Sequence, residues 1–144
     1  MTSAPSGVHL RMVLWKAERA MENVDRRSID KLGLGLSDFA VLEMLLHKGP
    51  QPVNTIGAKV LLTSGSITAA VDRLEARGLV RRANDPQDRR ARIVHLTPPG
   101  RKLITCAFAE HSNTMENAAA ILSPSQRSTL VRLLKKLGKS CGAA

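Results

Sequence analysis

The sequence predicts a mainly α-helical protein with a small β-wing: a winged helix-turn-helix with N- and C-terminal dimerisation helices. First, apolar residues recur at helical spacing over most of the 144 residues, a length that suits one folded domain. Second, the spacing becomes extended between Leu79 and Leu96, directly after three closely spaced helical segments. Third, the net charge of +10 favours a polyanionic partner, either nucleic acid or an anionic membrane.

The N-terminal part predicts a tail and two helices. Residues 1–6 are rich in small polar residues and Pro, as loose tails are. A long amphipathic helix is expected over residues 8–32. A second helix is expected with Ser37 as its N-cap, and the run 47–50 is a typical stop. The buried stripe of this second helix is expected to consist of Phe39, Leu42, Leu45 and Leu46.

A third helix is expected after a very short strand at Pro52 and Val53. Asn54 is its expected N-cap, and Ile56 and Val60 are expected to face inward. Two short helices joined by a tight turn, of which the second exposes small polar groups, form a helix-turn-helix. The sequence therefore predicts that the next helix is a recognition helix.

This recognition helix is expected between Thr63, a good N-cap candidate, and Gly78, placed to end it as a C′ residue. One face is apolar and is made of Ile67, Ala70, Val71 and Leu74. The opposite face carries short or forked side chains, which allow a helix to lie close to a DNA groove. These residues are Ser64, Ser66, Thr68, Ala69 and Arg73.

A β-hairpin is expected directly after the recognition helix, with strands over 79–83 and 91–96. The connecting turn, 84–90, begins with turn-forming residues and ends with Arg89 and Arg90. A hairpin tipped with arginine in this position is a wing, whose guanidinium groups can enter an adjacent minor groove. The alternative is that these arginines are solvated loop charges.

Two further helices are expected at the C-terminal end. Thr97 is the expected N-cap of one, and Ser123 opens a capping box with Pro124 at the first helical position of the other, which Gly138 is expected to close. The apolar stripes of these helices and of the first helix need a further surface to cover them. A twofold partner would provide one; a monomer that folds them onto its own core is the alternative.

Several runs of the sequence resemble a known family. The runs 36–42, 67–82, 85–90 and 96–100 are similar to the MarR family of bacterial transcription regulators, and the resemblance extends from Val8 to Gly138. It implies a winged-helix homodimer that binds a pseudo-palindromic operator, most often as a repressor released by small molecules, often phenolic, or by oxidation. The stretch 39–82 is similar to a subgroup with quinone-responsive members.

The resemblance also implies roles for residues. It places Ser64, Ser66, Thr68, Ala69 and Arg73 on the DNA side, and Gly65 permits close backbone approach. In the wing it implies that Asp88 holds the turn, that Arg90 reaches the minor groove and that Arg89 and Arg92 contact phosphates. The expected organisation is a tail at 1–6, dimerisation helices at 7–34 and 97–138, a DNA-binding lobe at 35–96 and a tail at 139–144.

Several residues have two possible roles. Trp15 could stack on an aromatic effector or anchor the dimer interface. Asp72 would repel phosphate, so an ion pair with a nearby arginine such as Arg73 or Arg77 is expected. One of Arg81 and Arg82 is expected to face phosphate and the other to be structural. Cys106 is expected in the core or an interface and Cys141 in an exposed tail; redox sensing is the alternative for this pair.

Other classes of protein find little support. The sequence has no phosphate-binding loop, nucleophile elbow or paired catalytic carboxylates, so we expect no enzyme and no cofactor. The four histidines match no zinc spacing, so no metal is expected. With no apolar run of membrane-spanning length and no signal sequence, the expected location is the cytoplasm. The remaining alternatives are a non-specific architectural DNA-binding protein and a basic membrane-surface protein.

Overall fold

The computed structural model describes residues 3–60 and 64–142 and confirms the predicted mainly helical fold with a small sheet. Residues 61–63, among them the expected N-cap Thr63, lie outside the described residues. The elements are α1 (Gly7–Asp30), α2 (Leu36–Lys48), β1 (Gln51–Pro52), α3 (Val53–Lys59), α4 (Ser64–Ala76), β2 (Val80–Asn84), β3 (Arg92–Leu96), α5 (Pro98–Ala119) and α6 (Pro124–Ser140).

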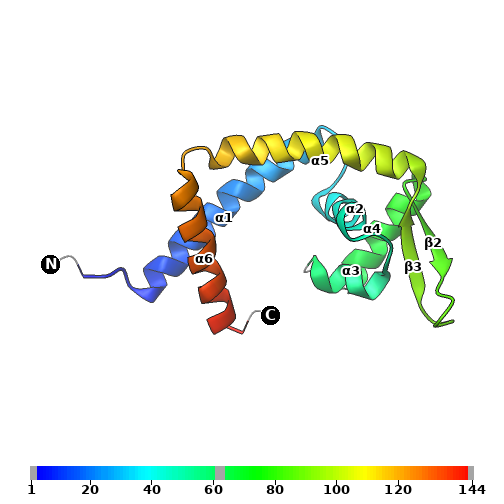
Figure 1. Ribbon diagram of the computed structural model, residues 1–144, viewed down its shortest axis with the longest axis horizontal. Helices are drawn as coiled ribbons and strands as arrows, with labels where there is room; N and C mark the ends of the chain where they lie inside the picture. The colour runs from blue at the N-terminus through cyan, green and yellow to red at the C-terminus, as the bar shows by residue number, and fades with distance from the viewer. Residues whose placement is uncertain (1–2, 61–63, 143–144) are drawn as a thin grey trace.

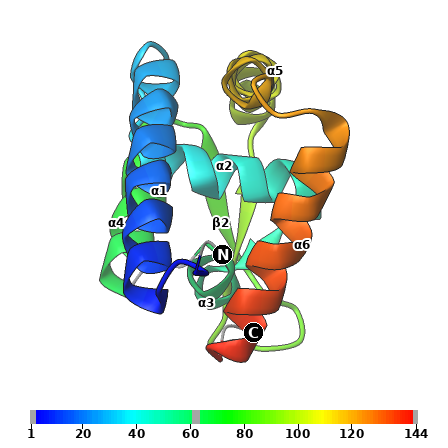
Figure 2. The ribbon, with the colours of Figure 1, turned by 90° about the vertical axis from the view of Figure 1, so that its left-hand side faces the viewer.

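A compact lobe and a set of long helices make up the molecule (Figure 1). The lobe contains α2, α3, α4 and the sheet, and α5 runs from the wing across the molecule to α6. Helix α1 packs along α5, while α6 turns away from the end of α5. Seen from that end, α1 and α6 stand on opposite sides, with α2 behind them (Figure 2). None of the helices in the described ranges has the length and apolar character needed to cross a bilayer.

The sheet joins the wing to the segment before α3. Its strand order is β1-β3-β2, and both pairings are antiparallel. Val80 lies opposite Leu96 at the base of the wing, and Asn84 lies opposite Arg92 near its tip. The wing is therefore fixed at its base against the same core that holds the recognition helix.

The core lies between α2, α4, the sheet and the first turns of α5. Fully burying a Val, Leu or Ile side chain contributes about 1.5–3 kcal/mol to the stability of the fold. The largest fully buried side chains are Val41, Leu42, Leu45, Ile56, Val71, Leu74, Val80, Val94 and Ile104. They come from almost every element of the lobe and from α5, so the lobe and the start of α5 share one core.

The predicted helix starts are confirmed where Pro follows the cap. Thr97 accepts a hydrogen bond from the backbone N–H of Gly100, and Ser123 forms a capping box with Gln126. The caps predicted for α2 and α3 are wrong. Gly35 rather than Ser37 caps α2, and Pro52 rather than Asn54 caps α3, without a side-chain hydrogen bond in either case. Packing of the apolar faces sets these two starts, because a side-chain cap contributes only about 1 kcal/mol.

The junction between α4 and β2 is held against the start of α5. Gly78 ends α4 with φ +72°, as predicted, and its carbonyl accepts a 2.6 Å hydrogen bond from the Thr97 hydroxyl. A Cβ atom on Gly100 would lie 1.9 Å from the carbonyl oxygen of Leu79, so only glycine fits there. At the other end, α6 continues through Gly138 to Ser140, and the prediction that Gly138 closes it is wrong.

Candidate nucleic-acid interface

Helix α4 has one buried and one exposed face. Ile67, Ala70, Val71 and Leu74 are at most 2% exposed, which confirms the predicted apolar face. On the other side, the residues at 65, 66, 68 and 69 are exposed. Ser64 begins the helix, but its side chain is outside the described residues. The exposed groups are small, so nothing bulky stands between the helix backbone and an approaching partner.

Arg73 was predicted on this DNA-facing side, and it makes an internal ion pair. Its Nη2 lies 2.7 Å from Oδ1 of Asp38, and its Nε also donates to that carboxylate. The Asp38 side chain is 8% exposed, whereas 54% of the Arg73 side chain remains accessible. Hydrogen bonding to Asp38 raises the pKa of Arg73, and the negative charge adds to this. The pair fixes α4 to α2.

A second arginine fixes the wing to α4. The guanidinium of Arg82, on β2, donates to Asp72 at 2.6 Å and to Glu75 at 2.9 Å. Burial lowers the pKa of Arg82, but the hydrogen bonds to both carboxylates outweigh this effect and raise it overall. The expected ion pair of Asp72 with an arginine is therefore confirmed, but its partner is Arg82 and neither Arg73 nor Arg77. Arg77 instead donates to the carbonyl of Gly33 at 3.0 Å.

The roles of Arg81 and Arg82 follow from this arrangement. Only 17% of the Arg82 side chain is exposed, so it is the structural member of the pair. Arg81 is exposed and lies opposite His95 across the hairpin. Burial lowers the pKa of His95, and the charge of Arg81 lowers it further.

The turn at the tip of the wing is stabilised by two aspartates. Oδ1 of Asp88 accepts the backbone N–H of Arg90 at 2.9 Å, and Oδ1 of Asp85 accepts that of Gln87 at the same distance. Short aspartate side chains commonly stabilise turns in this way. The structure thus gives Asp88 the turn-holding contact that the resemblance implied, and it leaves Arg89, Arg90 and Arg92 exposed at the tip.

One cleft brings the recognition helix and the wing together. Its volume is about 340 Å³, and it lies between α4, the wing and the start of α3. Thr68 of α4 lines it together with Arg90 and Arg92 of the wing. The other lining residues are Pro52, Val53, Asn54, Arg82, Asp88 and Ala91. Of the residues predicted from the sequence, Thr68, Asp88, Arg90 and Arg92 therefore meet at one place, and Arg89 lies outside the cleft.

Asn54 and Arg82 also line this cleft, and neither was predicted to do so from the sequence. Asn54 was expected to act as a cap, although its exposure at the start of α3 leaves its amide available. The alternation of Arg81 and Arg82 on a strand indicated that one of them faces inward, but it could not say which. Asp72 and Arg82 are ten residues apart, on either side of the turn at Gly78. This spacing was the signal that could have identified the ion pair between them.

The other singled-out residues lie away from this cleft. Trp15 is 47% exposed on α1, and the guanidinium carbon of Arg19 lies 5.6 Å from its ring centroid. Cys106 is exposed, so its expected place in the core is wrong, while the interface role and redox sensing stay predictions. Cys141 is exposed, as expected. Within residues 3–60 and 64–142, no group of three or more His, Cys, Asp or Glu side chains could hold a metal ion.

The fold and this face define a DNA-binding transcription regulator of the winged helix-turn-helix class. A sequence model of the MarR family matches residues 34–91. The HTH-type transcriptional regulator MhqR of Bacillus subtilis is 39% identical over 129 residues, which span 90% of this chain and 89% of that protein. The chain belongs to the MarR family, and like these relatives it is a transcription regulator and not an enzyme.

Solved structures show the same architecture. Bordetella bronchiseptica BpsR, studied for regulation of its DNA binding by 6-hydroxynicotinic acid, has a TM-score of 0.80 and 26% identity over 90% of this chain and 98% of its own. A mutant of Escherichia coli MarR complexed with operator DNA has a TM-score of 0.81 over 89% of this chain and 92% of its own. At 21% identity, that second match is a likeness of fold.

Proposed function

We propose that the protein is a homodimeric repressor that binds a pseudo-palindromic operator and is released by a small phenolic or quinone-like effector. The observation that carries the DNA-binding part is the cleft that Thr68 of α4 lines together with Arg90 and Arg92 of the wing. A recognition helix in the major groove and an arginine in the adjacent minor groove need this side-by-side placement. Such a protein acts in the bacterial cytoplasm, where the DNA is.

Individual residues then have separate tasks. Gly65, Ser66, Thr68 and Ala69 face the major groove, together with Ser64. Arg90 enters the minor groove, with its turn held by Asp88, while Arg89 and Arg92 neutralise phosphates. Arg73 contributes by orienting α4 through Asp38, and the exposed half of its side chain leaves room for a phosphate contact as well. Phosphate contacts position the protein and groove contacts give specificity.

Exposed apolar side chains support the homodimer. Val8, Leu10, Met12 and Val13 of α1 are 48–75% exposed, and Leu130, Leu133 and Leu134 of α6 are 40–47% exposed. Between the two helices lies an apolar groove of about 420 Å³, lined by Leu10, Leu14, Leu134, Leu137 and Cys141 among others. A second copy would cover this surface, and twofold dimers are the commonest closed oligomers. We assign Trp15, on the same helix, as an anchor of this interface.

The junction of α1, α2 and α5 supports an effector that controls DNA binding. Phe39 of α2 packs against His111 of α5 with ring centroids 4.9 Å apart, and Nε2 of His111 lies 3.7 Å from Oδ1 of Asp25 on α1. The neighbour of Phe39 is Asp38, which holds Arg73 of the recognition helix. A ligand that moves α5 relative to α2 would therefore also reorient α4.

The same junction offers a hydrogen-bonding group to such a ligand. Nδ1 of His111 is buried and has no hydrogen-bond partner in the part of the chain that the structure describes. An unsatisfied buried polar atom costs about 1–3 kcal/mol. A phenolic hydroxyl that donates to this nitrogen while its ring packs beside Phe39 would recover part of that cost. BpsR, whose DNA binding is regulated by 6-hydroxynicotinic acid, supports a small aromatic effector.

A competition assay tests the function against the alternative of a non-specific architectural protein. A duplex would be selected from a random library by the protein itself, and its affinity compared with that of unselected duplexes. Specific regulators typically prefer their site by 10³–10⁷-fold, on the order of 4–10 kcal/mol. Similar affinities for both would favour the architectural alternative. Light scattering of the free protein tests the dimer, and a protomer mass would contradict it.

Two further measurements test the residues and the effector. Arg90→Ala should weaken operator binding by about 1–3 kcal/mol, and unchanged affinity would remove the wing from the mechanism. A thermal-shift screen with phenols, quinones and aromatic acids should identify a ligand, because selective binding to the folded state raises the melting temperature. That ligand should also release the operator; binding without release would contradict the effector role.

A further inference from the structure

Helix α6 is unusually basic for an element distant from the wing. It contains five basic residues, Arg127, Arg132, Lys135, Lys136 and Lys139, and no acidic residue, while the whole chain has a net charge of +10. The DNA contacts proposed for the recognition helix and the wing do not involve the basic residues of α6. A shallow groove of about 770 Å³ runs along the basic side of α6 and is lined by these five residues with Ser128 and Val131.

Four of these residues form one line, which we call the basic stripe: Arg132, Lys135, Lys136 and Lys139. Their spacing of i, i+3, i+4 and i+7 places them on one side of the helix. Leu130, Leu133, Leu134 and Leu137 have the same spacing but begin two residues earlier. At 3.6 residues per turn, two residues are about 200°, so the leucines face away from the basic stripe. A partner that covers the leucines leaves the basic stripe open.

The basic stripe has no compensating acid among the described residues. Arg127, outside the stripe, donates to Glu116 at 2.7 Å and to the carbonyl of Ala119 at 3.1 Å, which fixes α6 at its turn from α5. No ion pair in the described ranges involves any of the four stripe residues. Like charges at i, i+3 and i, i+4 repel and destabilise a helix. A bound polyanion would remove this repulsion.

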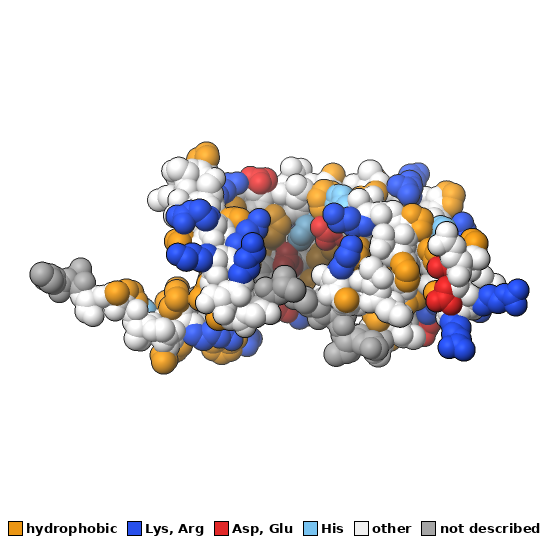
Figure 3. All heavy atoms as spheres, turned by 60° about the horizontal axis from the view of Figure 1, so that its bottom comes forward, with side chains coloured by type: hydrophobic (Ala, Val, Ile, Leu, Met, Phe, Trp, Pro, Cys, Tyr) orange, Lys and Arg blue, Asp and Glu red, His pale blue; other side chains and the backbone are white. Residues whose placement is uncertain are grey.

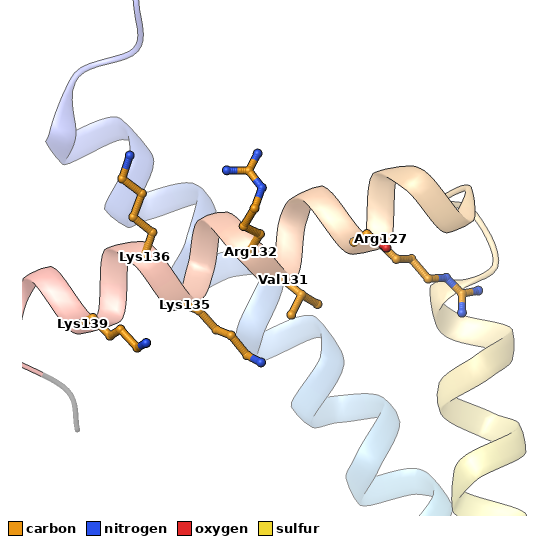
Figure 4. A pocket seen from close by; sticks show the side chains of 7 residues that line it. Arg127, Val131, Arg132, Lys135, Lys136 and Lys139 are labelled. Carbon is orange, nitrogen blue, oxygen red and sulfur yellow. The ribbon is translucent and has the colours of Figure 1, made fainter.

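The basic stripe and the wing are accessible from one side of the molecule. Figure 3 shows Lys and Arg side chains gathered over α6 and again over the wing at the opposite end, on the same face. In the closer view, Arg132 and Lys136 project to one edge of the basic stripe and Lys135 and Lys139 to the other, and all four line a single groove (Figure 4). One extended polyanion can therefore face both basic regions.

We propose that the basic stripe is a second phosphate-binding surface that contacts the backbone of the same DNA duplex bound by α4 and the wing. This proposal rests on the proposed function, which supplies the duplex. From Arg132 to Lys139 the stripe extends about 10 Å at 1.5 Å per residue. Phosphates of one strand advance about 3.4 Å each along the duplex axis, so the stripe spans about three of them. Flexible lysines suit such contacts, because they need charge and no fixed geometry.

The test is the salt dependence of operator binding by a fourfold variant in which each residue of the basic stripe becomes Gln. Glutamine keeps helix propensity, and the leucine side is untouched. Each lost phosphate contact should reduce the slope of log K against log salt by about 0.9, so about three contacts at each of the dimer's two stripes predict a reduction of about 5. Circular dichroism and light scattering of the variant check that the fold and the oligomeric state are unchanged.

A matched control separates contact from net charge. Gln at Lys16, Arg27, Lys31 and Lys48 removes the same charge from exposed positions of α1, its C-terminal end and α2. The proposal requires the control to keep most of the wild-type slope. Equal slopes for the two variants, or no change in the stripe variant, would overturn it. Phosphatidylserine vesicles provide a further test. If the wild type binds them and the stripe variant does not, while the stripe variant keeps the wild-type salt slope for DNA, the stripe is a membrane-binding surface and the proposal is overturned.

A third variant separates this proposal from the proposed function. Arg90→Gln leaves the basic stripe intact and should lose operator affinity by 10-fold or more. If Arg90→Gln loses affinity and the stripe variant does not, the stripe proposal fails while the proposed function holds. If neither variant changes binding to the selected duplex, the stripe proposal fails and the wing is also removed from the proposed mechanism.

Discussion

Arg73 and Asp38 join the recognition helix to the helix before it. The contact is two-pronged, with Nη2 of Arg73 2.7 Å and Nε 3.2 Å from the same carboxylate oxygen. Asp38 is buried, and Phe39 beside it contacts His111 of α5. The orientation of α4 therefore depends on α2, and through α2 on the long helices. Arg73 was predicted from the sequence to contact DNA. In the structure it helps to set the orientation of α4, the helix proposed to contact DNA.

A double-mutant cycle should measure this pair. Arg73→Met leaves a buried carboxylate without its partner and should destabilise the protein by about 1–3 kcal/mol, less than for a fully buried pair because Arg73 is half exposed. Asp38→Asn should cost a similar amount, and the double variant should cost less than the sum. Urea unfolding at a fixed protein concentration gives these free energies. Additive effects would contradict the coupling.

Operator binding by the same variants separates orientation from direct contact. If Arg73 acts through Asp38, then Asp38→Asn should weaken operator binding although Asp38 is buried and cannot touch DNA. If Arg73 acts only by contacting phosphate, Asp38→Asn should leave affinity unchanged or increase it, because the guanidinium is released. Only the first case predicts weaker operator binding by Asp38→Asn, so one titration decides between the two.

Gly65→Ala tests close approach of DNA to the start of α4. A Cβ atom at Gly65 would meet no atom of the described residues within 4 Å, and Ala is the better helix former. The melting temperature should therefore stay the same or rise, while operator affinity should fall if the DNA backbone passes against Gly65. Gly35→Ala at the N-cap of α2, where a Cβ atom also has open space among the described residues, is the control. Equal affinity of both variants would remove Gly65 from the interface.

His95 should make the stability of the protein depend on pH. Its pKa lies below the ordinary value of 6.5, because burial and the charge of Arg81 disfavour the protonated form. Below pH 6.5 the unfolded chain binds a proton at this residue that the folded protein does not, so the free energy of unfolding should decrease as pH falls. In His95→Gln the decrease between pH 7.5 and 5.5 should be smaller. Parallel curves for variant and wild type would contradict this.

Features that depend on local sequence were predictable. The apolar period, the shift to strands after Gly78 and the two caps followed by Pro each involve residues within a few positions of one another. These signals were enough for the order of elements and for the exposed side of α4. They also indicated the Asp88 turn, because its hydrogen bond spans two residues.

Side-chain partners far apart in sequence were not predictable. Arg73, Arg77 and Arg82 are chemically alike, yet one holds Asp38, one a backbone carbonyl and one the pair Asp72 and Glu75. Which acceptor each arginine binds depends on where α2, the α1–α2 turn and β2 lie around α4. Tertiary packing determines these positions. The same packing explains why Ser37 and Asn54 are not caps. Helix α2 begins at Leu36 and α3 at Val53, so both residues lie inside the helices.

Gly100 should be the least replaceable glycine in the described chain. In Gly100→Ala the new Cβ atom would lie 1.9 Å from the carbonyl oxygen of Leu79, a backbone atom that is also the acceptor for the N–H of Thr97. The start of α5 would have to move away from the α4–β2 junction, and we expect a loss of about 3 kcal/mol in the free energy of unfolding. Gly57→Ala is the matched control, since its Cβ atom would approach only the Ile67 side chain, at 3.2 Å. That change should cost less than about 1.5 kcal/mol, because a methyl group can shift and Ala favours helix α3. If urea unfolding ranked the two variants in the reverse order, the clamp between Leu79 and Gly100 would not be what fixes α5 to the lobe.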